Sequence, residues 1–456
     1  MFAAFVAFRA SPNRALADSF YSTLLSYSVL TTGSVHLERF LGDAEAMRRL
    51  PGYVPERGYP YQIEKAGAHF FYWYPPAPSL LAVPLVGAAS WFGLAPLDRD
   101  GRYDPARDVV LHGWLAPLVS AAIVGVLFAT AACLLTLPTA ATVTVFAALG
   151  SPIWSTLSRG MSSNTWHVLL IAGVVLELLS AGGRERGAST RAGSTRTRPV
   201  RPALVATLLA WAYLSRPATS IAIACVTVWM IVRHPHRFPV YALTGAAWAA
   251  LFVAYSFAQF GTPLPSYYRL AARLSLEYVV PSATGILFSP SRGLFVYSPV
   301  VLWVAWIAVR YRRTIRFPDL ARLATVVLFG SFATTCGWRV WWGGHSYGPR
   351  LAADFIPWIF LLAVLGLDAR RTALGVEAAA SRPPRRRLEL ALGIVLGLAS
   401  AALHAPGALQ IETLVWNERL GPEVGEPPLL WDWAHPQFLA AYRMPPRFSA
   451  PRPPTD

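Results

Sequence analysis

The chain has 456 residues, of which 54% are hydrophobic and only 14% are charged. Soluble domains carry about 25% charged residues, so the composition excludes a soluble protein with a single core, a disordered chain and a small disulfide-stapled module. The apolar residues fall into long blocks separated by short arginine-rich or aromatic stretches. The sequence therefore predicts an all-α, polytopic membrane protein.

The net charge is +16, and Lys65 is the only lysine among the 40 basic residues. Nucleic-acid binding would require basic residues gathered on one soluble face, whereas these arginines lie between apolar blocks. The arginines are therefore expected to set which side of the membrane each loop faces. We expect membrane lipids as partners and no nucleic acid.

The first part of the chain, residues 1–110, contains no clear transmembrane segment. Residues 2–8 are apolar but too few to cross a bilayer, which needs at least about 17 residues, so we expect a stub or half of a truncated helix with the amino terminus inside. Residues 9–110 then form one long outer loop. Within it, residues 16–30 and 78–94 are expected to lie as helices in the membrane interface, and Pro84 and Trp91 favour this over a span.

The rest of the chain contains the predicted spans. Apolar blocks cover residues 112–135, 138–152, 164–180, 239–257, 294–309, 319–336, 354–367 and 388–404. Residues 203–233 form a longer block, and a single helix through it would bury Arg216 near mid-membrane, which is costly. We expect two short helices that meet at Ser215-Arg216-Pro217 on the outer surface.

The predicted architecture has about eleven transmembrane helices over residues 1–404, with the first stub included. Residues 405–456 form an outward-facing tail rich in proline and tryptophan.

Orientation follows from the arginine content of short loops. Residues 181–202, 233–238, 310–317 and 368–388 hold 18 arginines in 57 positions, whereas the alternating loops 153–163, 257–293 and 337–353 hold 6 in 65. The first set is expected in the cytoplasm and the second outside, in a bacterial-type inner membrane.

Four arginines of the outer side are candidate anion ligands: Arg159, Arg216, Arg292 and Arg350. Arginine pairs bidentately with phosphate and stays charged, so we expect this patch to bind an anionic group at headgroup depth, such as a lipid phosphate. Anchoring to headgroups is the alternative for each, and it suits Arg159 and Arg216 better. Arg292 and Arg350 lie in turns rich in Gly, Ser and Pro, whose amides can also reach a phosphate.

Asp18 is the candidate catalytic base because it lies in the first outer loop, after the first apolar segment, on the interfacial helix expected at residues 16–30. Beside cations it would stay ionised and could accept a proton from an acceptor hydroxyl; the alternative is a solvated or helix-capping aspartate. Glu38, Glu56 and Glu64 share the loop and are weaker candidates. Asp354 is expected to pair with Arg350, four residues earlier.

Further contacts to substrate are expected from the outer loops, at Tyr267, Tyr268, His345 and Tyr347, although packing or hydrogen bonding is an alternative for His345. The Trp341-Trp342 pair favours an aromatic belt over a platform that stacks on sugars. No histidine cluster stands out for a metal along the sequence, so we expect no metal and no cofactor.

Four of these motifs resemble the GT-C glycosyltransferases, membrane enzymes that use polyprenyl-phosphate sugars, such as protein O-mannosyltransferases and lipid A aminoarabinose transferases. The motifs are Asp18 early in the outer loop, Tyr74-Pro75-Pro76 before an interfacial helix, Leu214-Ser-Arg-Pro217, and the stretch Gly348-Pro-Arg-Leu-Ala-Ala-Asp-Phe-Ile-Pro357. The resemblance covers about residues 1–405 through topology and short motifs. It departs where mannosyltransferases have an Asp-Glu pair, which here is Asp18-Ser19.

The resemblance implies an inverting transfer of a sugar from a polyprenyl-phosphate donor to an acceptor hydroxyl on the outer face. Asp18 would be the base, and arginines would stabilise the departing phosphate. A lipid-linked saccharide transporter and a non-catalytic scaffold are the alternatives. A flippase would need polar residues through its spans, which are nearly free of ionisable groups, and a scaffold would not need arginines in glycine-rich turns.

Overall fold

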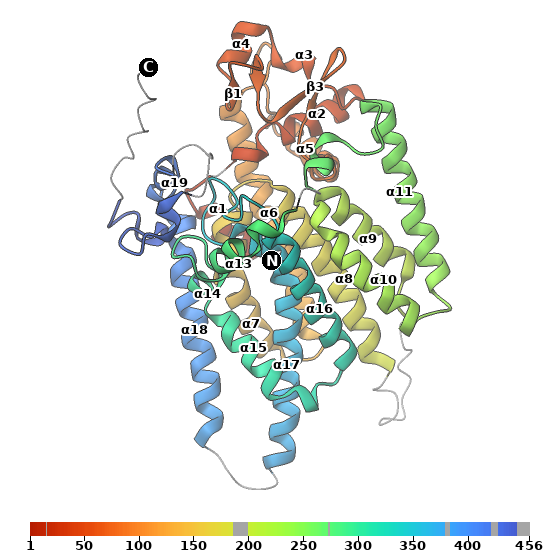
Figure 1. Cartoon of the computed structure of the whole chain (residues 1–456), viewed down its shortest axis with the longest axis vertical. Coiled ribbons are helices and arrows are strands. Elements are labelled where there is room, and N and C mark those ends of the chain that lie inside the picture. Colours follow the sequence, from red (N-terminus) through yellow and green to blue (C-terminus); the bar gives the residue numbers. More distant parts are fainter. Residues whose placement is uncertain (15, 186–198, 272–273, 379–383, 421–426, 445–456) are drawn as a thin grey trace.

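The computed structural model describes residues 1–14, 16–185, 199–271, 274–378, 384–420 and 427–444. Helices run roughly along the long axis of the molecule, and a layer of short helices and β-hairpins covers one end of them (Figure 1). The bundle consists of α6 (Pro105–Ala132), α7 (Leu137–Leu149), α8 (Ser163–Glu185), α9 (Pro202–Ser215), α10 (Ser220–Arg233), α11 (Phe238–Phe260), α15 (Val300–Arg310), α16 (Pro318–Cys336), α17 (Ile356–Ala378) and α18 (Pro384–Leu409).

Two groups of helices meet in the bundle. In one, α6 packs on α8, α8 on α9 and α9 on α11; in the other, α15 and α16 pack on α17, which also packs on α8, while α18 packs on α15 and α7. The short α1 (Phe2–Ala10) lies along α6. One continuous cluster of buried apolar side chains joins both groups and includes Leu127, Val175, Val226, Ile307 and Leu361.

The helical class is confirmed. Within the described residues, six helices are long and apolar enough to cross a membrane: α6, α8, α11, α16, α17 together with the turn before it, and α18. The apolar helices α7, α9, α10 and α15 are shorter, and α9 has 14 residues, about 21 Å at 1.5 Å per residue. A bilayer core is about 30 Å thick, so the count of eleven spans stays a prediction.

The predicted break at Ser215-Arg216-Pro217 is confirmed. Helix α9 ends at Ser215, Arg216 adopts an extended backbone (φ −152°, ψ 119°), and a 3₁₀ turn over Pro217–Thr219 leads into α10. A residue before proline avoids the helical region because of the proline ring. The break therefore follows from Pro217, and it turns Arg216 out of the helix.

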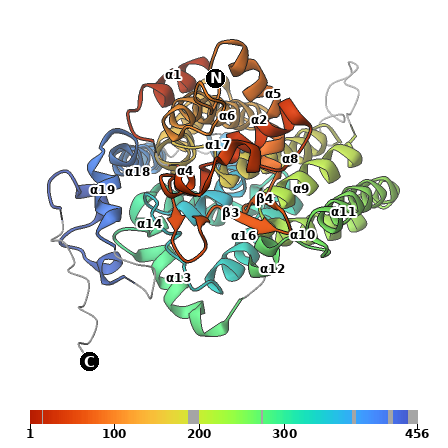
Figure 2. The same cartoon turned by 90° about the horizontal axis from the view of Figure 1, so that it is seen from above.

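The covering layer is built from residues 17–104 (Figure 1, red to orange). Its elements are a 3₁₀ turn (Ala17–Ser19), α2 (Ser22–Thr32), α3 (Glu38–Leu41), α4 (Ala44–Arg48), the hairpin of β1 (Tyr53–Val54) and β2 (Tyr59–Pro60), the hairpin of β3 (Ile63–Ala66) and β4 (His69–Tyr72), and α5 (Ala77–Trp91). Both hairpins are antiparallel, and in the second Ile63 pairs with Tyr72. Helices form within both expected stretches, 16–30 and 78–94, as α2 and α5, which pack on each other. Helix α2 begins only at Ser22, so Asp18 lies in the 3₁₀ turn before it and not on the predicted helix. Seen from above, this layer lies over the bundle (Figure 2).

The remaining short elements complete that end of the molecule. They are a π-helical turn (Ile153–Leu157), α12 (Ser266–Ala271), a 3₁₀ turn (Leu276–Tyr278), α13 (Val279–Phe288), α14 (Leu294–Tyr297), a 3₁₀ turn (Arg350–Phe355), α19 (Glu412–Glu418), and 3₁₀ turns at Pro428–Trp431 and Gln437–Leu439; a further 3₁₀ turn (Arg312–Thr314) follows α15. Helix α18 continues to Leu409, past the expected boundary at residue 404. The tail segment around α19 packs beside α18 (Figure 2). Residues 421–426 and 445–456 of the predicted tail, and most of the predicted loop 181–202, lie outside the described residues.

The predicted orientation can be tested by cysteine labelling. In a background without the 3 native cysteines, Asp100→Cys and His345→Cys should react with a membrane-impermeant thiol reagent on intact cells, whereas Arg313→Cys should react only after lysis. All three positions are exposed. Labelling of Asp100→Cys only after lysis would mean that α5 crosses the membrane, and the eleven-span prediction would be wrong.

Candidate functional site

Asp18 lies in a strained turn. Among the described residues, the two non-glycine positions with positive φ are Ala17 (35°) and Tyr21 (69°), and they flank it. Such conformations cost about 1–3 kcal/mol each and persist only where the surroundings enforce them. The second hairpin does so, because the Tyr72 hydroxyl donates to the Asp18 carbonyl (2.5 Å) and the Gln62 amide donates to the Ala17 carbonyl (3.1 Å).

The Asp18 carboxylate bridges two distant parts of the chain. Its Oδ1 accepts a hydrogen bond from the Tyr74 hydroxyl and its Oδ2 accepts one from Arg350 Nη2, each 2.7 Å long. Burial raises the pKa of Asp18, but the charge of Arg350 and the two hydrogen bonds outweigh it. The pKa of Asp18 is therefore below its usual value, and the group is ionised at neutral pH.

A second ion pair lies beside the first. Arg216 Nε donates to Asp354 (2.8 Å), and Arg216 Nη1 donates to Asn164 Oδ1 (3.0 Å). Asn164 in turn donates to the other Asp354 oxygen (3.1 Å). The expected pair between Arg350 and Asp354 is wrong: a 3₁₀ turn covers both residues, and at three residues per turn side chains four apart point in different directions.

These side chains converge on one small pocket. Asp18, Tyr74, Arg216, Tyr267 and Arg350 line it, and its volume is about 30 Å³, room for about two water molecules. All four motifs of the GT-C resemblance contribute a residue to the pocket or to the ion pair beside it, although Asp18 and Arg350 are 332 positions apart. The charges around the pocket balance, because Arg350 pairs with Asp18 and Arg216 pairs with Asp354.

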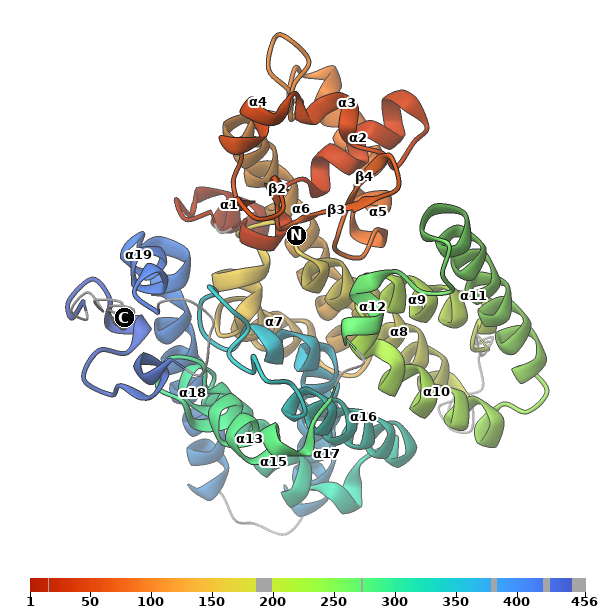
Figure 3. The ribbon, with the colours of Figure 1, turned by 45° about the horizontal axis from the view of Figure 1, so that its top comes forward.

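One wall of the pocket is aromatic. Tyr267 comes from α12, which lies beside α9 near the covering layer (Figure 3). Its ring centroid is 5.2 Å from that of Trp73 and 5.6 Å from that of Tyr74. Burial raises the pKa of Tyr74 and of Tyr267, so both hydroxyls keep their protons and act as neutral donors.

The other predicted substrate contacts lie elsewhere. Tyr268 is buried, donates to the Leu214 carbonyl (2.7 Å) and lines a neighbouring pocket. Tyr347 is buried and donates to the Leu403 carbonyl (2.6 Å), which ties the loop before α17 to α18. His345 is exposed in that loop. Of the four predicted contacts, the structure brings Tyr267 alone into the pocket with Asp18.

Arg292 is buried away from the pocket, with 2% of its surface exposed. It donates to the Trp342 carbonyl (3.1 Å), to Asn417 (3.1 Å) and to Gln437, and its guanidinium lies 5.4 Å from the Trp416 ring. These partners lie in the loop before α17 and in the tail segment. Arg292 therefore joins the tail to the bundle, and its donors go to protein acceptors.

Arg159 is fully buried and is also absent from the Asp18 pocket. It donates to the Phe8 carbonyl (2.7 Å) and to the Ser158 hydroxyl (2.5 Å), so it fixes the end of α1. Trp341 and Trp342 are each only 2% exposed and pack with Trp416. They form neither a belt at the surface nor an open platform for a sugar.

Sequence reasoning missed Tyr74 and Asn164 as partners in this constellation, and it paired Asp354 with Arg350 in place of Arg216. Tyr74 had a signal, because it opens the Tyr-Pro-Pro motif. Asn164 had none, since it is a single amide at the start of α8. Comparison of the chain with protein-family models, with curated proteins and with solved structures finds no match. The resemblance to GT-C enzymes therefore remains a prediction from four short sequence motifs.

Proposed function

We propose that this chain is a multi-pass membrane glycosyltransferase that moves a sugar from a polyprenyl-phosphate donor to an acceptor hydroxyl at the outer face of a bacterial-type inner membrane. The observation that carries the proposal is the ionised Asp18 carboxylate in contact with Arg350, with Arg216 lining the same pocket. A base for a hydroxyl and cations for a leaving phosphate are the two requirements of this transfer.

The proposed reaction is a single displacement. The acceptor oxygen attacks the anomeric carbon, and the bond from that carbon to the phosphate oxygen breaks with its electron pair left on the phosphate. The hydroxyl proton passes to Asp18. Arg350 and Arg216 offset the charge that develops on the lipid phosphate, and the aromatic wall of Trp73, Tyr74 and Tyr267 suits the apolar faces of a sugar ring.

Donor binding must rearrange the pocket, because about 30 Å³ cannot hold a sugar. Arg350 uses two of its five N–H groups for Asp18 and the Gly343 carbonyl in the described structure, and a phosphate can replace Asp18 as its partner. Losing Arg350 would raise the pKa of Asp18 back toward its ordinary value, which makes Asp18 a stronger base. Binding of the donor phosphate to Arg350 would thus make Asp18 a better base for the acceptor hydroxyl.

A separate apolar cavity supports a lipid-linked donor. It has a volume of about 320 Å³ and lies between α7, α15, α17 and α18, where Phe146, Trp303, Ile359 and Ile394 line it. Ala352 lines it as well, two residues after Arg350. A prenyl chain in this cavity would have its phosphate end beside the turn that carries Arg350.

The direct test uses the purified chain in nanodiscs with a radiolabelled polyprenyl-phosphate sugar and a panel of acceptors. We expect release of polyprenyl phosphate together with transfer of the label. In parallel, a lipid extract of a deletion strain should contain accumulated polyprenyl-phosphate sugar. Absence of both results would overturn the proposal. Movement of intact donor between leaflets without cleavage would instead favour a transporter.

The pH dependence of kcat/KM tests the assignment of Asp18, because this parameter reports the free enzyme. A base must be ionised to work, and its ionised form is lost as the pH falls through its pKa. With the pKa of Asp18 held below the ordinary value of about 3.9, kcat/KM should not decline until the pH is below about 4. Brief acid exposure followed by assay at pH 7 controls for unfolding. A decline centred between pH 5 and 7 would show that another group is the base.

A further inference from the structure

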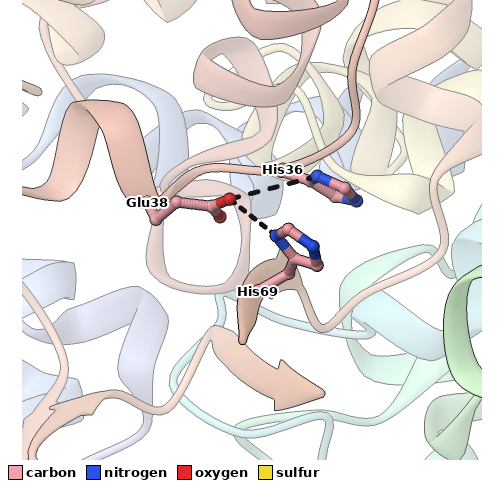
Figure 4. Close-up of side chains that lie close together, drawn as sticks. All are labelled: His36, Glu38 and His69. Carbon is pink, nitrogen blue, oxygen red and sulfur yellow. Dashed lines mark hydrogen bonds and ion pairs between the residues drawn. The ribbon is translucent and has the colours of Figure 1, made fainter. Parts of the chain in front are cut away.

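A cluster of metal-binding side chains lies in the covering layer, apart from the Asp18 pocket. Among the described residues, one group of three histidine, cysteine or acidic side chains has its ligand atoms within 4.8 Å of one another: His36, Glu38 and His69. His36 lies two residues before α3, Glu38 is the first residue of α3, and His69 begins β4 (Figure 4). Sequence reasoning did not predict this cluster, because His69 is 31 positions from Glu38.

One carboxylate oxygen faces both imidazoles. Glu38 Oε1 lies 2.8 Å from His69 Nδ1 and 4.0 Å from His36 Nδ1, and Figure 4 shows both rings presenting a nitrogen to it. In a tetrahedral site with bonds of about 2.0–2.2 Å, neighbouring ligand atoms lie about 3.3 Å apart. The two observed separations bracket that value, so small side-chain shifts would accommodate a metal.

The second ring nitrogen of His36 decides which form this side chain takes. His36 Nε2 lies 3.0 Å from the amide oxygen of Gln259, at the end of α11. An oxygen there makes Nε2 the donor, so in the neutral ring Nδ1 carries a lone pair directed toward Glu38. His36 Nδ1 and Glu38 Oε1 would then both be acceptors that face each other, and a cation between them could bind to both.

The stacking of the two rings argues in the same direction. Their centroids are 3.9 Å apart and their planes differ by 17°, so the two rings lie side by side at the Glu38 carboxylate (Figure 4). Neutral histidine is the form that binds a metal.

The outer partners have the arrangement that metal sites use to orient their ligands. Ligating histidines commonly donate their other nitrogen to an oxygen, and ligating carboxylates accept a further hydrogen bond. Here Gln259 accepts from His36, and Glu38 Oε2 accepts from the Phe70 amide (3.2 Å). The three side chains are 27%, 38% and 47% exposed, so an ion can enter and a water molecule can fill a fourth position.

We propose that His36 Nδ1, Glu38 Oε1 and His69 Nδ1 bind one divalent transition-metal ion of the Zn²⁺ type. Two nitrogens and one carboxylate select zinc over magnesium or calcium, which prefer oxygen ligands alone. The ion joins the start of β4 to the segment before α3 and, through Gln259, to the end of α11. Because β4 leads into Tyr72 and Tyr74, which hold Asp18, the metal would stiffen the layer that forms the pocket.

The test is titration of the full chain in nanodiscs with ZnCl₂, after EDTA treatment and removal of any polyhistidine tag. We expect one Zn²⁺ per chain, and slower hydrogen exchange in residues 63–72 when it binds. His69→Ala and Glu38→Gln should each abolish this binding. Gln259→Ala leaves the ligands in place and should weaken it by about 10- to 100-fold.

His435→Ala is the matched control. His435 also forms a partly exposed pair with a carboxylate, 2.7 Å from Asp432, but in the described structure that pair belongs to no group of three. This variant should bind Zn²⁺ as wild type does. If the wild type takes up less than one equivalent, or if His69→Ala and Glu38→Gln both bind like the wild type, the proposed site is wrong.

Discussion

Replacing Asp18 with asparagine should lower turnover of a polyprenyl-phosphate sugar by about 100- to 10,000-fold, the usual effect of removing a general base. Asparagine keeps the size of the side chain and can still accept from Tyr74 or from Arg350, but it cannot take up the acceptor proton. Steady-state release of polyprenyl phosphate by Asp18→Asn in nanodiscs measures the effect.

Structural damage has to be separated from lost chemistry in this variant. The amide offers one oxygen where the carboxylate accepts from both Tyr74 and Arg350, and an unsatisfied donor costs about 1–3 kcal/mol. Thermal unfolding and donor binding should therefore be measured alongside turnover. We expect a modest loss of stability and donor binding that persists, against a collapse of the rate.

Glu64→Gln is the matched control for Asp18→Asn. Glu64 belongs to the same layer and accepts a hydrogen bond from Ser266 of α12, and it lines the neighbouring pocket rather than the one around Asp18. The same chemical change there should leave turnover near wild type. Normal turnover by well-folded Asp18→Asn would rule out Asp18 as the base, and a collapse in Glu64→Gln would point to Glu64.

The helical segments were predictable because their signal is local. A run of apolar residues marks each helix of the bundle, and Pro217 marks the break between α9 and α10. The number of spans is less accessible, since α7 and α15 have 13 and 11 residues and lie below the length at which composition alone decides. Short helices of this kind depend on the helices packed against them.

The candidate site was predictable in part for a related reason. Asp18, Arg216 and Arg350 are each the charged residue of a short motif that the sequence analysis singled out, and the fold brings these three residues together. Their pairing was not predictable, because it depends on the 3₁₀ turn that directs Asp354 toward Arg216. The roles of Arg159 and Arg292 depend on hydrogen-bond acceptors at Phe8 and Gln437, which are far away in the chain. A local sequence pattern does not predict such long-range hydrogen bonds.

Replacing Arg350 with lysine should distinguish a phosphate ligand from an interfacial anchor. Lysine reaches headgroups about as well as arginine, but an ammonium is a point charge without the planar fork that binds two oxygens. We expect Arg350→Lys to lose about 1–3 kcal/mol, the scale of a hydrogen bond to a charged group. This corresponds to a fall of about 5- to 150-fold in kcat/KM.

The structure sharpens this expectation. Arg350 Nη2 contacts Asp18 while Nη1 donates to the Gly343 carbonyl (3.3 Å), so two separate nitrogens hold the guanidinium in place. An ammonium that keeps the contact to Asp18 lacks the rigid planar fork with which Arg350 spans both acceptors. The loop around it turns at Gly343, Gly344 and Gly348, all with positive φ, and lysine keeps the positive charge that Arg350 places beside Asp18. Expression and thermal stability should therefore stay near wild type.

Arg339→Lys is the internal control, because Arg339 is exposed in the same loop and does not line the pocket. Its kcat/KM should be unchanged, since a solvated cation needs no fork. If both lysine variants kept full activity, Arg350 would be an anchor and the phosphate assignment would be wrong. If both lost activity equally, the loop would act as one folded unit, and the loss could not be assigned to phosphate binding by Arg350. A loss confined to Arg350→Lys, with donor KM raised and unfolding temperature unchanged, is the result that a phosphate ligand requires.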